Sequence, residues 1–128
     1  MTPAPLEKPV PSEKENEMTD NTLQPREMLL ALVNPLEGQD EAFRPWYWET
    51  HIPEVLGLPG FVAAQRYRAA TDAPASVSHQ YATIYEVEGS AASARDMLFG
   101  AGLGMSPDLD LGTMVFVPFV AEGNPVLP

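Results

Sequence analysis

The stretch "DEAFRPWYWETHIPEVLGLPGFVAAQRYRA", residues 40–69, decides the fold, because a helix pattern and a strand pattern stand on either side of a turn signal. Phe43, Tyr47 and His51 recur every four residues, so they share one face of a helix predicted over 38–51. The stretch therefore predicts a helix that carries an aromatic face and a histidine at its last turn.

Acidic and proline residues mark the expected boundaries of these elements. Asp40 is expected to cap the helix N-terminus. Pro53 disfavours helical geometry at the preceding residue, so the helix is expected to end at Ile52, with a short extra turn possible after it. Pro59 and the glycine after it form a turn, and residues 61–69 read as a strand.

The flanking sequence supplies the remaining elements of one domain. The patterns predict strands over 26–35, 79–89 and 113–123, and a helix over 90–102 with Ser90 as its N-cap. The order strand-helix-strand-strand-helix-strand is typical of the ferredoxin-like split arrangement, an α+β fold. We therefore expect a four-stranded antiparallel sheet with both helices on one face.

The last predicted strand is apolar on both faces. One face holds Met114, Phe116 and Pro118, and the other holds Val115, Val117 and Phe119. Two helices cover one side of a sheet, and we expect Tyr81 and Tyr85 to lie on the uncovered side. An uncovered apolar face favours a homodimer that packs sheet against sheet. Pro118 lacks a ladder donor, which predicts an edge strand or a bulge.

Chain length and composition indicate a single domain. Residues 1–25 hold five prolines and seven charged residues, which predicts a disordered extension. The ferredoxin-like domain is expected over residues 26–123, followed by a C-terminal tail over 124–128. No apolar run approaches twenty residues, so no membrane span is expected.

The charge balance and the absence of cysteine exclude several kinds of partner and chemistry. The formal net charge is −11, and the stretch after residue 25 holds five arginines against thirteen acidic residues. A nucleic acid or an anionic membrane surface is therefore not an expected partner. With no cysteine, thiolate catalysis and disulfides are excluded, and a cytoplasmic location is expected.

The segment "WYWETHIPEVLGLPGFVAAQRYR", residues 46–68, resembles the motif of the EthD-like family in the dimeric α+β barrel superfamily. The matching pieces are Trp46-Tyr47, His51-Ile52-Pro53, Leu56, Pro59-Gly60-Phe61 and Arg66-Tyr67. The resemblance implies a ferredoxin-like protomer, a barrel-like homodimer and a pocket between sheet and helices. Relatives include cofactor-free monooxygenases, cyclases, isomerases, dehydratases and haem-binding proteins, so it implies a fold more than a reaction.

His51 is the first candidate for catalysis. An imidazole titrates near neutral pH and can act as a general acid or base, and the resemblance places the family's histidine here. The alternative is a packed histidine whose ring caps carbonyls at the helix end. Tyr81 and Tyr85 could orient a substrate or fill the barrel, and Arg66 could hold a carboxylate or an enolate, or pair with Glu86.

Aromatic side chains are expected to shape a pocket for a small apolar or aromatic molecule. These candidates are Trp46, Tyr47, Phe61 and Phe116. Metal binding is disfavoured, because His79 has no clear carboxylate partner and Asp108 and Asp110 read as surface acids. We expect a cofactor-independent lyase, isomerase or cyclase. The alternative is a non-catalytic protein that binds a hydrophobic ligand or haem.

Overall fold

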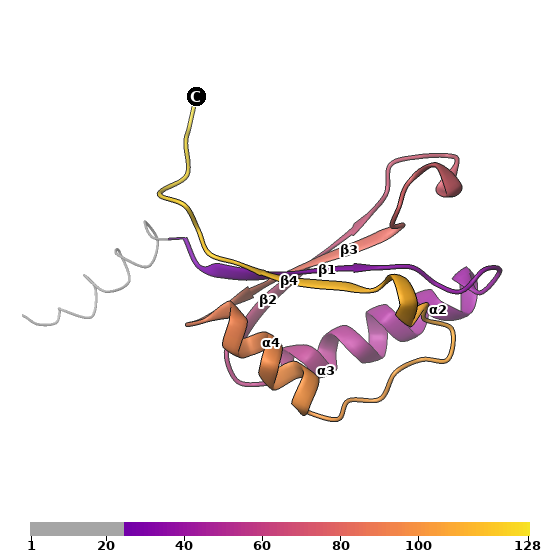
Figure 1. Ribbon diagram of the computed structural model, residues 1–128, viewed down its shortest axis with the longest axis horizontal. Helices are drawn as coiled ribbons and strands as arrows, with labels where there is room; N and C mark the ends of the chain where they lie inside the picture. The colour runs from indigo at the N-terminus through magenta and orange to yellow at the C-terminus, as the bar shows by residue number, and fades with distance from the viewer. Residues whose placement is uncertain (1–24) are drawn as a thin grey trace, which may run out of the picture. The chain divides into compact units, whose positions relative to one another are not determined.

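Four strands form one antiparallel sheet in the order β2-β3-β1-β4 (Figure 1). The structure is a computed structural model that describes residues 25–128, so all but the last residue of the extension predicted over residues 1–25 lies outside the described residues. The element order and the strand order match the ferredoxin-like α+β arrangement. The strands are β1 (Glu27–Val33), β2 (Phe61–Arg68), β3 (Tyr81–Val87) and β4 (Val115–Phe119).

Pro118 confirms the expectation that β4 is an edge strand. It lies opposite Leu29 of β1, and β4 has no second neighbour among the strands that the structure describes. A residue without an N–H is tolerated at this position, because the outer side of an edge strand needs no ladder donor. The sheet and its helices belong to a unit of residues 27–120, and residues 121–128 contain no helix or strand.

The first helical region runs farther than the sequence predicts. Helix α2 (Asp40–Trp46) continues through a π-helical turn, η1 (Tyr47–His51), into α3 (Ile52–Leu56). The expectation that the helix ends at Ile52 is therefore wrong. The N–H of Ile52 donates to the carbonyl of Tyr47, five residues earlier. This wider turn lies directly before Pro53, whose missing N–H already interrupts the regular ladder.

The two helical regions begin in different ways. Asp40 is not the N-cap of α2, because Gln39 holds that position without a side-chain hydrogen bond. Helix α4 (Ala91–Gly100) confirms its predicted cap, since the Ser93 N–H donates to Ser90 Oγ at 3.1 Å. Short 3-10 turns, η2 (Pro74–Ser76) and η3 (Leu111–Thr113), lie in the loops that precede β3 and β4.

The core lies between the sheet and the helices, which occupy one side of it (Figure 1). Tyr85 pairs with Leu29 of β1, and both are fully buried. Tyr81 is also buried, with its ring centroid 5.8 Å from that of Phe43 in α2. The prediction that both tyrosines occupy the uncovered face is therefore wrong. The aromatic face of α2 packs against these rings, which draws them to the covered side.

The opposite face of the sheet is mostly apolar, and no helix of residues 25–128 lies on it (Figure 1). Its apolar side chains, placed by the strand register, are those of Met28, Leu30, Leu32, Ala82, Ile84, Val115, Val117 and Phe119, and Gln65, Tyr67 and Glu86 lie on the same face. The prediction that β4 is apolar on both faces is confirmed. We call this surface the open face. Residues 25–128 contain no helix with the length and hydrophobicity needed to cross a membrane.

Candidate functional site

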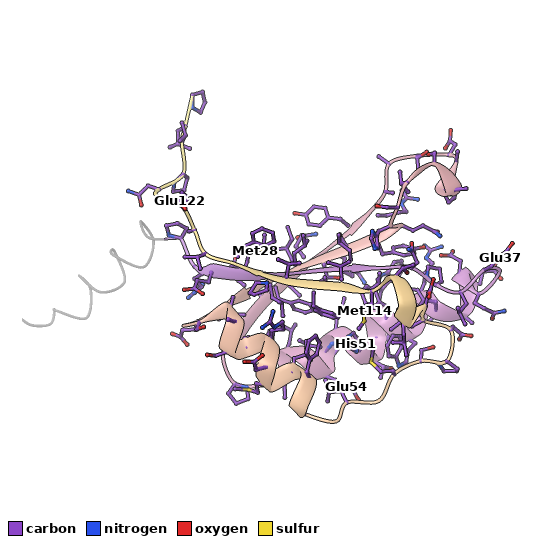
Figure 2. All side chains as sticks on the ribbon, in the orientation of Figure 1. Met28, Glu37, His51, Glu54, Met114 and Glu122 are labelled. Atoms are coloured by element: carbon purple, nitrogen blue, oxygen red, sulfur yellow. The ribbon has the colours of Figure 1, made fainter. Side chains whose placement is uncertain are left out.

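A cavity of about 250 Å³ lies beside β4, between the end of α4 and the loop that follows it. Figure 2 shows His51 in the layer below the sheet, and Met114, just before β4, lines the same cavity. The lining residues are His51, Leu98, Phe99, Gly102, Leu103, Met105, Leu111, Met114 and Phe116. Apart from the imidazole, these residues are apolar or glycine, so the cavity suits an apolar molecule with one polar group.

The ring of His51 is held by stacking on two aromatic neighbours from its own helical region. Its centroid lies 4.9 Å from the Trp46 ring and 5.9 Å from the Tyr47 ring, with interplanar angles of 22° and 18°. The side chain is only 4% exposed. The π-helical turn that ends at His51 is a feature found often at functional sites. The imidazole therefore meets the cavity in a fixed orientation.

Burial lowers the pKa of His51 below its ordinary value of 6.5. Its Nδ1 atom is buried and has no hydrogen-bond partner among residues 25–128. The alternative in which the ring caps terminal carbonyls is wrong, because the helix continues to Leu56 and the described residues give His51 no such bond. At neutral pH the ring is uncharged, so one of its nitrogens can accept a proton.

A second set of polar groups lies buried in the core near this helix. The hydroxyl groups of Tyr47 and Thr83 form a hydrogen bond, and burial raises the pKa of Tyr47 to about 12. Burial also raises the pKa of Tyr85, whose hydroxyl has no partner among residues 25–128. Both phenols therefore stay protonated at neutral pH, and the Tyr85 hydroxyl is a free donor in a dry environment.

Replacing Tyr85 by phenylalanine is expected to raise the free energy of unfolding by about 1–3 kcal/mol, because an unsatisfied buried hydroxyl costs that much. Tyr47→Phe is the matched control and is expected to destabilise by a similar amount, since it leaves Thr83 without its partner. Urea denaturation at pH 7 measures both. A loss of stability in Tyr85→Phe would show that the hydroxyl is satisfied in solution.

The structure brings only part of the predicted site together. His51 and Phe116 line the same cavity, and Trp46 and Tyr47 contact the imidazole from behind. Phe61 lies deeper, where its ring meets that of Tyr85 edge-on at 5.7 Å.

Two predicted residues lie elsewhere. The Tyr81 hydroxyl donates a hydrogen bond to the Asp40 carboxylate, and the Arg66 guanidinium lies 4.5 Å from the centre of the Trp48 ring. The suggested pairing of Arg66 with Glu86 is wrong. Arg66 lies opposite Thr83, whereas Glu86 lies opposite Ala63 and on the other face of the sheet.

Several cavity residues were missed at the sequence level. They come from the end of α4 and the loop before β4, including Phe99, Leu103 and Met105. The run "GAGLGMS" in that loop contains the only local signal, a set of large apolar residues between glycines. His79 has a structural role, since its Nε2 lies 2.6 Å from the Thr113 carbonyl oxygen and joins the loop before β3 to the segment before β4.

Comparisons with known proteins add no family to these observations. Family models, curated proteins and solved structures give no match to this chain. The EthD-like resemblance therefore stays a prediction that rests on the motif residues around His51. Among residues 25–128, no group of three or more histidine, aspartate or glutamate side chains is placed to hold a metal ion.

Proposed function

We propose that this protein is a cofactor-independent enzyme that moves a proton on a small apolar or aromatic oxygenated metabolite. The reaction is of the lyase, isomerase or cyclase type, and His51 is its general acid or base. The observation that carries the proposal is a buried, uncharged imidazole, with an unpartnered Nδ1, on the wall of an otherwise apolar cavity. A histidine that only packed would need neither the cavity nor a free nitrogen.

The chemistry follows from the surroundings of the imidazole. An uncharged ring nitrogen can take a proton from a carbon next to a carbonyl group, or from a hydroxyl, and return it at another position. The apolar walls formed by Leu103, Met114 and Phe116 exclude water, which strengthens each polar contact made with the substrate. Trp46 and Tyr47 fix the plane of the ring. Because the same imidazole takes and returns the proton, turnover needs no second acid or base in the cavity.

The size of the cavity limits the substrate. About 250 Å³ is just below the usual range for ligand pockets, so the cavity holds a single ring or a short chain better than a porphyrin. The non-catalytic alternative, in which the cavity only stores a hydrophobic ligand, uses the same walls. It differs in one respect, because storage does not require the proton-accepting nitrogen of His51.

We also propose that two copies pair through their open faces to form a homodimer. Leu30 lies at the centre of this surface, opposite Ile84 on one side and Val117 on the other. Phe119 and Tyr67, toward its edges, are 43% and 51% exposed. A contiguous apolar face of this kind marks an interaction site, and a second copy offers a surface of matching shape and character.

A ligand screen by thermal shift tests the proposal. Aromatic acids, phenols, lactones, enones and haem are added to the wild type and to Leu103→Trp, which fills the cavity. A ligand near 100 times its Kd stabilises the wild type by about 2.7 kcal/mol, roughly 10 °C in Tm. We expect a shift with a small ring compound, lost in Leu103→Trp and retained in Ala92→Glu, an exposed control on α4. No shift with any compound, or equal shifts in Leu103→Trp, would contradict the proposal.

A further inference from the structure

A second cavity, of about 180 Å³, lies at the start of α2, and its wall is polar and charged. The polar residues that line it are Asp40, Arg44, Arg68, Thr71, Gln80 and Tyr81. None of these residues lines the apolar cavity beside His51. The two cavities therefore offer different chemistry.

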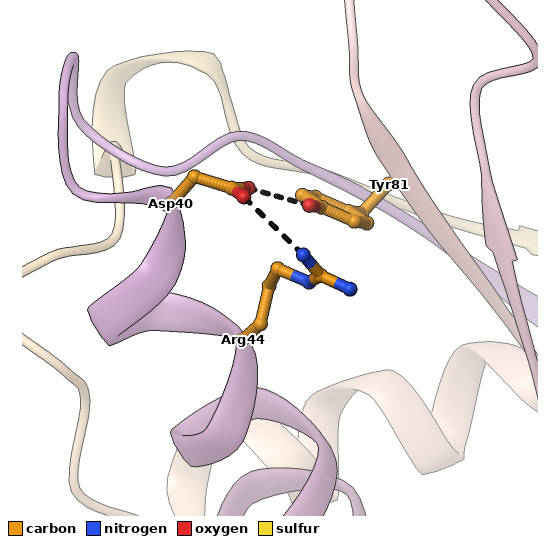
Figure 3. Close-up of polar contacts among 3 residues, drawn as sticks. All are labelled: Asp40, Arg44 and Tyr81. Carbon is orange, nitrogen blue, oxygen red and sulfur yellow. Dashed lines mark hydrogen bonds and ion pairs between the residues drawn. The ribbon is translucent and has the colours of Figure 1, made fainter.

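Asp40 organises one wall of this charged cavity. Figure 3 shows the Tyr81 hydroxyl and the Arg44 guanidinium directed at its carboxylate. The hydroxyl donates to Oδ1 at 2.5 Å, and Arg44 Nη1 lies 3.6 Å from Oδ2. Burial, and then Asp40, raise the pKa of Tyr81 to about 12, so the phenol stays a donor. The charge of Asp40 is thus offset by one guanidinium.

Arg68 adds a second guanidinium that Asp40 does not offset. It lies on β2 opposite Tyr81, and it has no ion pair with an acidic side chain of residues 25–128. The Nε atom of Arg44 is buried and has no acceptor among the same residues. The charged cavity therefore holds one excess positive charge, and the Arg44 Nε–H has no acceptor among the described residues.

The positive charge is concentrated here in a chain that is otherwise acidic. Three of the five arginines after residue 25 gather in this region. Arg68 lines the charged cavity, and Arg44 and Arg66 both lie over the Trp48 ring, at 4.9 and 4.5 Å from its centre. Packing on Trp48 orients the Arg44 guanidinium. Its ion pair with Asp40 is made through Nη1 and not through Nε. A net charge of −11 makes such a cluster unlike the rest of the chain.

We propose that the charged cavity binds a small carboxylate anion through Arg44 and Arg68. One excess positive charge is neutralised by a monoanion, whereas a dianion such as phosphate would leave one negative charge uncompensated in the cavity. A guanidinium presents two parallel N–H groups that match the two oxygens of a carboxylate. About 180 Å³ corresponds to roughly six water molecules, enough for a carboxylate on a short carbon chain.

An NMR titration of the full ¹⁵N-labelled chain tests this site. Sodium propionate is the ligand, propionamide its uncharged isostere, and sodium chloride the control for ionic strength. We expect saturable shifts at the backbone amides of Ala69, Thr71 and Gln80 with propionate alone. Shifts at Gly102 and Met105 instead would place the ligand in the apolar cavity and overturn the proposal.

Charge substitutions decide the role of the guanidinium groups. Arg68→Gln is expected to weaken propionate binding about tenfold or more, and Asp40→Asn to tighten it. If Asp40 had only a structural role, Asp40→Asn would not tighten propionate binding. Arg95→Gln, on α4 and paired with Asp96, is the control and leaves the affinity unchanged.

Three results would overturn the carboxylate site. They are equal binding of propionamide, an unchanged affinity in Arg68→Gln, and tighter binding of phosphate than of propionate. The site does not depend on the proposed enzyme activity, because His51→Gln is expected to leave the propionate titration as it is in the wild type.

Discussion

Glutamine in place of His51 is expected to lower turnover about 10²- to 10⁴-fold, the usual contribution of a positioned acid or base. Glutamine keeps a planar polar group of similar size on the cavity wall but cannot accept a proton near neutral pH. Ligand affinity is therefore expected to change far less than kcat. The measurement is steady-state kinetics with the compound class that the thermal shift screen identifies, together with the ligand Kd of both proteins.

The pH profile gives a second readout of the same residue. A general base works in its uncharged form, so activity falls as the pH drops through its pKa. Because burial lowers the pKa of His51, the acid limb of kcat/KM is expected to have its midpoint below 6.5. His79→Gln is the matched control, since this second histidine lies outside the cavity. Full activity in His51→Gln, with the acid limb retained, would show that His51 is not the acid or base of the reaction.

Glutamate in place of Leu30 is expected to convert a dimer into monomers. Leu30 lies on the inner strand β1 at the centre of the open face. Burying an unpaired carboxylate between two sheets costs several kcal/mol, which corresponds to at least a 100-fold rise in the dimer dissociation constant. Sedimentation equilibrium or light scattering after gel filtration distinguishes a chain of 13.9 kDa from its dimer.

A charge on the far side of the protein is the control for the dimer. Ala92→Glu adds the same carboxylate to the exposed side of α4 and is expected to remain dimeric. Circular dichroism shows whether Leu30→Glu is still folded, and Val117→Lys repeats the experiment on the neighbouring strand. A wild type that is monomeric at 100 µM and above would contradict the open-face dimer.

Much of the fold can be predicted because its signals are local. Alternating apolar residues fix strand β3, and both faces of β4 can be assigned from its sequence alone. Ser90 identifies the start of α4 because a hydroxyl that accepts from the N–H three residues later is a strong local preference. The four-residue spacing likewise places Phe43, Tyr47 and His51 on one buried face.

The failures come from contacts between distant segments. Which face of β3 meets the helices depends on the partner of Tyr85, and that is decided by packing against residues far away in the chain. Asp40 is drawn from a capping role by the Tyr81 hydroxyl, which is 41 residues away. The cavity beside His51 is lined partly by the loop after α4, whose sequence has no clear periodicity. The residues of this loop that line the cavity can be identified only in the folded chain.

The π-helical turn has a consequence for anyone who plans substitutions along the first helical region. A helical wheel assumes about 100° per residue, but the turn over 47–51 advances less per residue, so the segments before and after it are out of phase. One wheel drawn through residues 40–56 assigns wrong directions after His51. Two wheels are needed, one on each side of that turn. The first describes the aromatic rings buried by α2 and η1, and the second describes Ile52 and Val55, which are buried in α3.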